Sequence, residues 1–96
     1  MIKIEISKDK ITITGHANYN DYGKDIVCAA VSSTVITTVN GILSINSDAL
    51  KVTEGKTLII EILKHDEVTD KLINNMINLL EELKNDYKDN INIRRC

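Results

Sequence analysis

The sequence predicts a small α+β domain with the element order ββαββαβ, in which one mostly antiparallel sheet packs against two helices. Residues 2 to 7, IKIEIS, and residues 11 to 15, ITITG, alternate between apolar and polar positions, as half-buried strands do. Residues 66 to 87 instead carry apolar side chains at three- and four-residue steps, which is typical of an amphipathic helix. Because a chain of 96 residues has room for one hydrophobic core, these elements are expected to share it.

The first two strands are expected to form a hairpin over residues 1 to 15. The polar segment Lys8-Asp9-Lys10 separates them and supplies the connection. Residues 16 to 24, HANYNDYGK, have turn composition and no hydrophobic period, so we expect a loop there.

The next segment, DIVCAAVSSTVITTVNGILS, has conflicting signals. Its β-branched residues favour a strand, but its length favours a helix, because strands rarely reach twenty residues. With Asp25 as N-cap and Gly41 near the far end, we expect a helix from Ile26 to Leu43. Its apolar residues face nearly all sides, so something besides the sheet should cover it, either the second helix or another subunit.

Two strands are expected at residues 49 to 53 and 57 to 63, joined by the turn Glu54-Gly55-Lys56. Asp66 then caps the second helix, and INIRR, residues 91 to 95, forms a last short strand. The pattern leaves the strand order open. The apolar stripe of the second helix comprises Val68, Leu72, Met76, Leu79, Leu80, Leu83 and Tyr87.

Composition narrows the function classes. With no Trp, no Phe and three Tyr, the core must be aliphatic, and a net charge of −2 gives no reason to expect direct contact with nucleic acid. The apolar runs look too short to span a bilayer and the N-terminus MIKIEISKDK alternates, so we expect a cytoplasmic chain with no membrane contact. A Cys28–Cys96 disulfide is not expected in a reducing compartment, and the absence of CxxC and HxxxH spacings argues against a metal site.

Cys28 is the candidate nucleophile. If Asp25 caps the helix, Cys28 lies at the third helical position, where unbonded N–H groups carry partial positive charge. Such a position stabilises a thiolate and so lowers the pKa of the thiol. The same N–H groups could hold an oxyanion, so nucleophile and oxyanion hole would come from one helical turn.

His16 is the candidate general acid/base, because an imidazole can accept the thiol proton and later protonate a leaving amine. Eleven residues separate it from Cys28, and Tyr19, Tyr22 and the hinge candidate Gly23 lie among them. This composition fits a mobile flap over a peptide groove, so we expect residues 17 to 24 to vary in the absence of substrate.

Asp25 and Ser32 each have two interpretations. Asp25 could only cap the helix, or it could also orient His16 as a third catalytic residue. Ser32 lies one helical turn after Cys28 on the same side, where it could contact the thiol or the substrate, or simply allow close packing.

The alternative to an enzyme is a non-catalytic ribosome- or protein-binding module, because a lone Cys amid Ala and Val is usually buried and inert. A redox-sensing thiol is a third and less favoured hypothesis, since only Cys96 could resolve it. His65, in the polar HDE turn, is expected to be solvated.

The segment GHANYNDYGKDIVCAAVS, residues 15 to 32, resembles the signature of the ribosomal-processing cysteine proteases, the Prp family. The resemblance extends over essentially all of residues 1 to 96, and it implies a single ribosomal-processing cysteine protease domain. It is carried by Gly15-His16-Ala17, Tyr22-Gly23, Asp25-Ile26-Val27-Cys28-Ala29 and Ser32.

This resemblance implies a cysteine endopeptidase that removes the N-terminal extension of large-subunit ribosomal protein twenty-seven, needed for ribosome assembly, cutting after an aromatic residue. Cys28 would be the nucleophile and His16 the general acid/base, with Asp25 and Ser32 at the family's matching positions and no metal or cofactor. Members form homodimers, which would explain the apolar first helix. Ala30 stands where many relatives have Gly. The sequence of the middle of the loop, residues 18 to 21, also differs from that of relatives. This difference affects how well the substrate fits, not the catalytic reaction. The candidate substrate-binding residues are Gly15, Tyr19, Tyr22, Gly23 and Ser32.

Overall fold

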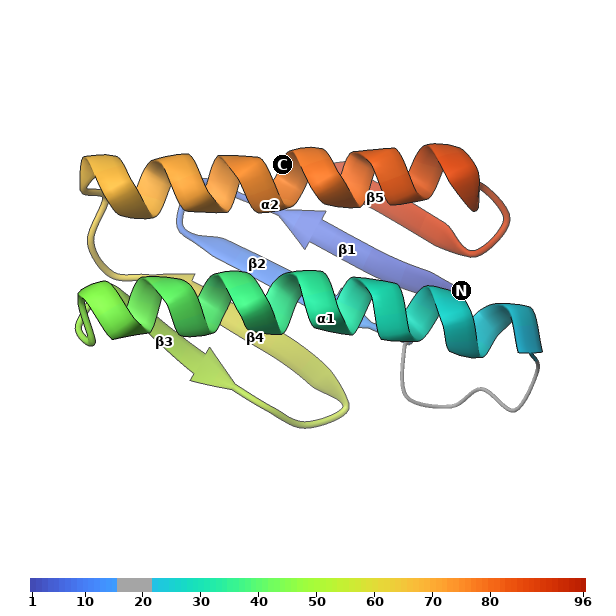
Figure 1. Ribbon diagram of the computed structural model, residues 1–96, viewed down its shortest axis with the longest axis horizontal. Helices are drawn as coiled ribbons and strands as arrows, with labels where there is room; N and C mark the ends of the chain where they lie inside the picture. The colour runs from blue at the N-terminus through green and yellow to red at the C-terminus, as the bar shows by residue number, and fades with distance from the viewer. Residues whose placement is uncertain (16–21) are drawn as a thin grey trace.

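The helices and strands follow the predicted order. The computed structural model of the chain describes residues 1–15 and 22–96. Figure 1 shows two helices lying side by side across one five-stranded sheet. The elements are β1 (Ile2–Ile6), β2 (Lys10–Thr14), α1 (Tyr22–Ile45), β3 (Leu50–Thr53), β4 (Thr57–Ile62), α2 (Glu67–Asp86) and β5 (Ile91–Arg95).

The sheet is mixed, with the strand order β3-β4-β2-β1-β5. Three of its pairings are antiparallel, and only β1 and β5 run parallel, with Ile4 paired to Ile13 on one side and to Ile93 on the other. The parallel pair arises because the chain crosses back through α2 before β5 begins (Figure 1). This confirms the mostly antiparallel sheet and supplies the strand order that the pattern left open.

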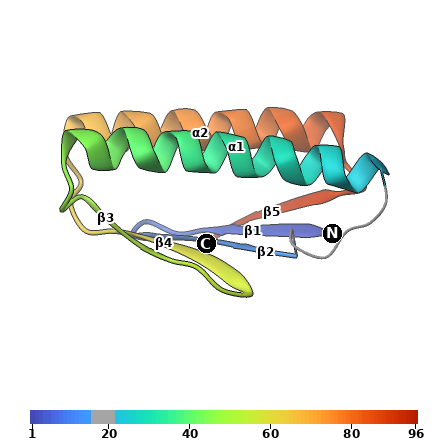
Figure 2. The ribbon, with the colours of Figure 1, turned by 60° about the horizontal axis from the view of Figure 1, so that its bottom comes forward.

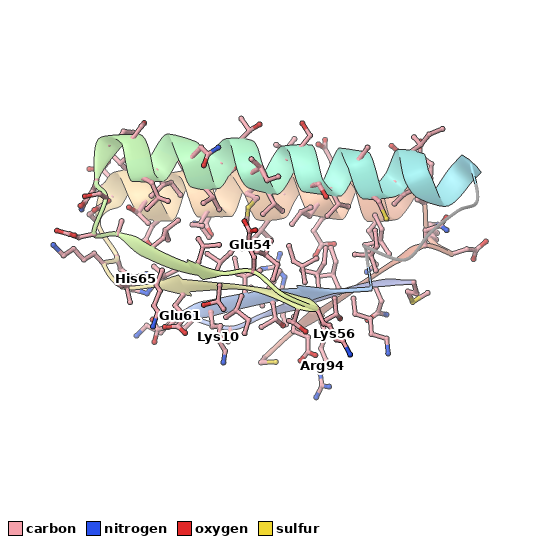
Figure 3. The ribbon with its side chains drawn as sticks, turned by 90° about the horizontal axis from the view of Figure 1, so that it is seen from below. Lys10, Glu54, Lys56, Glu61, His65 and Arg94 are labelled. Carbon is pink, nitrogen blue, oxygen red and sulfur yellow. The ribbon has the colours of Figure 1, made fainter. Side chains whose placement is uncertain are left out.

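The helices cover one face of the sheet only, as the side view in Figure 2 shows. Because strand residues alternate between faces, Ile4, Ile11 and Ile60 point to the helices and are fully buried. The opposite face carries charged side chains, among them Lys10, Glu61 and Arg94 (Figure 3). The core between the two layers is aliphatic, as composition predicted.

The first helix starts earlier than predicted. It runs from Tyr22 to Ile45 and not from Ile26 to Leu43. Asp25 therefore lies inside the first turn, and the prediction that it is the N-cap is wrong. The apolar pattern that signalled the helix begins only at Ile26, and the first turn contains Gly23 and two charged residues, a composition typical of a loop.

The apolar residues of α1 lie on several sides of the helix, as predicted, and one of these sides is buried. Val27, Val31 and Val35 are buried in the core, as are Val39 and Ile42 further along. α2 packs beside α1. The second helix was one of the two alternatives expected to cover the apolar sides of α1 that do not face the sheet. Three isoleucines of α1, at positions 26, 36 and 45, stay exposed. They are ten and nine residues apart, which places them on different sides of the helix. These are Ile26 (61%), Ile36 (54%) and Ile45 (64%).

α2 begins where predicted, after Asp66. The Oδ1 of Asp66 accepts a hydrogen bond from the Thr69 N–H at 2.8 Å, and this bond lowers the pKa of the Asp66 carboxyl. The buried face of α2 differs in part from the predicted stripe. Val68 and Leu79 are exposed, and residues 73 and 77, both isoleucines, are buried in the core. The helix carries apolar residues on two adjacent faces, and only packing decides which face meets the sheet.

By length and composition, α1 could cross a membrane, and it is the one helix in the described parts of the chain that passes this test, over Ile26–Ile45. The prediction that the apolar runs are too short is therefore wrong. A core helix passes the same test, and α1 buries its valine face against the sheet.

Candidate active site

Cys28 lies in the second turn of α1, since the helix begins at Tyr22. Its side chain is half-buried and packs against the hydrophobic core, between the fully buried Val27 and Val31. Neither Cys28 nor Cys96 is in a disulfide. The thiol thus lies where the buried face of α1 meets its accessible flank.

The early start of α1 changes the electrostatics predicted for Cys28. The N–H groups without a partner inside a helix belong to its N-cap and its first three residues, so in α1 they end at residue 24. The prediction that Cys28 is the third helical residue, with an oxyanion hole in its own turn, is therefore wrong. The effect of the helix dipole also weakens beyond the first turn, so the dipole would stabilise a Cys28 thiolate less than the sequence predicted.

Gly15 has a backbone role. Its φ of 82° lies in the left-handed region, and a Cβ at this position would overlap the carbonyl oxygen of Met1. Only glycine fits this turn without strain, and the turn leads the chain out of β2 just before His16. His16 and Tyr19 lie outside the described residues.

Tyr22 and Gly23 belong to the first helical turn and not to the loop. The prediction that Gly23 is a loop hinge is therefore wrong, because a helical backbone is held by its hydrogen bonds. Of the predicted flap over residues 17 to 24, the last three are helical, and residues 17 to 21 lie outside the described part of the chain.

Ser32 is half-buried and lies one helical turn after Cys28 on the same flank of α1. It lines a groove of about 420 Å³ between α1 and the β3–β4 hairpin, called here the α1–hairpin groove. Sequence reasoning missed this groove because its walls come from elements far apart in the chain. Its lining includes Ser32, Ile36, Asn40, Val52, Glu54 and Leu58.

Comparison with known proteins decides the family. The model of the family Peptidase_Prp, "Cysteine protease Prp", matches residues 1–92. The chain belongs to the cysteine protease Prp family. It is therefore a cysteine protease, a hydrolase of peptide bonds.

Relatives and solved structures agree with this Prp assignment. The ribosomal processing cysteine protease Prp of Bacillus subtilis (strain 168) is 32% identical over 89 residues, which cover 84% of this chain and 80% of that protein. The protein of the same name from Mycoplasma genitalium is 41% identical over 56 residues, 58% of this chain and 54% of the relative. The fold is similar to that of an essential ribosomal processing protease Prp from S. aureus, solved in complex with a substrate peptide, with a TM-score of 0.92, 23% identity and 100% of both chains covered.

His65 lies away from the Prp candidate site. Its Nε2 lies 2.6 Å from Asp9 Oδ1 and its Nδ1 lies 2.8 Å from Asp70 Oδ1, so the ring bridges two carboxylates. These hydrogen bonds raise the pKa of His65 above its ordinary value. The ring lies at the end of the sheet opposite the start of α1 (Figure 3). His65 is exposed, as expected, and its contacts with Asp9 and Asp70 also join the β1–β2 turn to α2.

Proposed function

We propose that this chain is a ribosomal-processing endopeptidase that removes the N-terminal extension of large-subunit ribosomal protein twenty-seven, cutting after an aromatic residue. The observation that carries the proposal is family membership, together with relatives named ribosomal processing cysteine proteases. The position of Cys28, half-buried and about one helical turn before the groove that begins at Val31 and Ser32, supports it.

In the proposed reaction, Cys28 is the nucleophile and His16 the general acid/base. His16 takes the thiol proton, and the Cys28 sulfur bonds to the carbonyl carbon of the residue before the cut. The carbon–nitrogen bond then breaks, and the amine leaves with the proton that His16 returns. Water, activated by His16, cleaves the thioester, which releases the new carboxylate and restores the thiol. The oxyanion needs donors other than the amide of Cys28, because that amide lies inside the helix.

Asp25 does not cap the helix, so of its two interpretations we keep the orienting role. Helical register puts residue 25 three positions before Cys28, on neighbouring surface of α1. We assign it the role of a positioning residue for His16.

We further propose that the protease acts as a homodimer in the cytoplasm. Both helices leave apolar side chains exposed, among them Ile26, with an exposed fraction of 61%, and Leu79, with 39%. A second copy of the chain could cover these side chains, which supports a homodimer. Light scattering after size exclusion tests this proposal. A monomer at all concentrations up to about 100 μM contradicts it.

The function is tested by mixing the protein with the extended ribosomal precursor and reading the products by mass spectrometry. A single cut after the aromatic residue is expected, and it should be lost in Cys28→Ala and in His16→Ala. Cys96→Ala is the matched control, because Cys96 is exposed at the chain end, and it should cleave normally. No cut, or a cut that survives Cys28→Ala, would favour the non-catalytic binding module.

A further inference from the structure

The α1–hairpin groove has an apolar interior. Val31 and Val35 of α1 form one wall. Ile13 and Leu58, which are paired across β2 and β4, form the floor, and Val52 of β3 continues it. A groove of about 420 Å³ is large enough for several side chains of a bound peptide.

The groove begins about one helical turn after the candidate nucleophile, at Val31 and Ser32, and runs on along α1. Positions 28, 32, 36 and 40 are four residues apart and follow one flank of the helix, and Ser32, Ile36 and Asn40 line the groove. With a rise of about 1.5 Å per residue, these three lie about 6, 12 and 18 Å along the axis from Cys28. An extended peptide advances about 3.3 Å per residue, so a chain held at Cys28 would place its residues about two to five positions from the cut over the groove.

The residues that the structure describes leave part of this apolar surface uncovered. Ile36 is 54% exposed at the rim, and Val52 and Leu58 are only half-buried. An extended substrate would bury these side chains and gain free energy from doing so.

Glu54 adds a charge to the groove. It follows Leu50 and Val52 on the helix-facing side of β3, because strand residues alternate. In Figure 3 it points from the hairpin tip toward α1, whereas Lys56 of the same turn lies on the opposite side of the sheet. Among the described residues that line the groove there is no Lys or Arg, and no ion pair of Glu54 is found in the described part of the chain.

We propose that the α1–hairpin groove is a specificity subsite that binds the substrate about two to five residues from the scissile bond. An apolar substrate side chain packs on Ile36, Val52 and Leu58, and a basic substrate side chain pairs with Glu54. This assignment rests on the proposed function, since it takes Cys28 as the point where the peptide is cut.

The test uses binding, so that it does not depend on cleavage. Cys28→Ala protein is titrated with a set of precursor peptides in which each position from two to five on either side of the cut carries Lys or Glu in turn. At one position Lys should bind about two- to fivefold more tightly than Glu, the range of an exposed ion pair. Adding Glu54→Lys should reverse that preference. Lys56→Glu, on the same turn and the opposite face, is the matched control and should leave it unchanged.

A second pair of variants tests the apolar contact. Ile36→Glu in the Cys28→Ala background should weaken binding of the tightest-binding peptide at least about tenfold. The bound peptide would cover the new carboxylate and remove it from water, where it had replaced an apolar contact. Ile45→Glu makes the same change at a similarly exposed position at the end of α1 and should bind normally. Thermal midpoints of all variants exclude unfolding as the cause of a loss.

The outcomes separate the groove from the proposed function. If Cys28→Ala binds peptides with no dependence on Glu54 and Ile36, or binds none, the subsite proposal is overturned, whatever the wild type cleaves. If binding depends on both residues but the wild type cuts nothing, the groove is a peptide site and the protease assignment falls.

Discussion

The Nε2 atom of His65 lies 2.6 Å from Oδ1 of Asp9, and this contact joins residues that are 56 positions apart in the chain. The same ring reaches Asp70 on α2, so one imidazole holds the β1–β2 turn against the start of the second helix. No other ion pair among the described residues links these two elements.

Stability should depend on pH through His65. Its pKa is raised by Asp9 and Asp70, so its contribution is fully present below the unfolded pKa of about 6.5 and is lost as the pH rises through the folded pKa. We expect the difference in denaturation midpoint between wild type and His65→Gln to be largest near pH 5.5 and to shrink toward about pH 8.5. A difference that stays constant over this range would contradict the charged bridge.

Gly15→Ala should destabilise the fold by about 1–3 kcal/mol. The reason is the positive φ of 82° together with the overlap of the new methyl group with the Met1 backbone. Gly41→Ala is the control, because a Cβ there meets nothing within 4 Å and the position is helical. It should be neutral or stabilise by about 0.5–1 kcal/mol. Urea unfolding of both variants measures the contrast, and equal effects would refute the steric account of Gly15.

Asp66→Ala should lower the denaturation midpoint at neutral pH, because the N–H of Thr69 loses its acceptor. Asp66→Asn keeps a side-chain oxygen and should retain most of the stability. The pKa of Asp66 is lowered in the fold, so its contribution is present above the unfolded pKa and is lost as the pH falls through the folded pKa. The wild type should therefore approach the alanine variant in acid, and circular dichroism melts would reveal a failure to converge.

Cys28 should react with iodoacetamide faster than Cys96 near neutral pH, by about tenfold or more if its thiolate is stabilised. Cys96 is exposed and serves as an internal reference for an ordinary thiol, whereas Cys28 is half-buried and would react more slowly without activation. His16→Ala should reduce the rate at Cys28 only. Mass spectrometry of digests taken over time follows both sites, and a slower Cys28 would count against an activated nucleophile.

Periodic segments made the fold predictable. The alternation of Ile2, Ile4 and Ile6 identified β1, and β5 was predicted at its observed bounds, Ile91–Arg95. The Asp66 cap marked the start of α2 to the residue. The start of α1 was missed because residues 22 to 25 show no apolar period and include Gly23, which favours a loop. The predicted Asp25 cap and the oxyanion hole in the turn of Cys28 depended on that start and are wrong for the same reason.

The sequence alone determined the element order, the aliphatic core, the family signature and the two candidate residues Cys28 and His16, because each depends on local periodicity or on fixed spacing along the chain. Only the tertiary structure decided which face of α2 meets the sheet and that β5 lies beside β1. It also brought Ser32 and Ile36 opposite Val52 and Glu54, and it placed His65 between Asp9 and Asp70. These relationships join residues far apart in sequence, and they are settled by how two amphipathic layers pack, which no local pattern encodes.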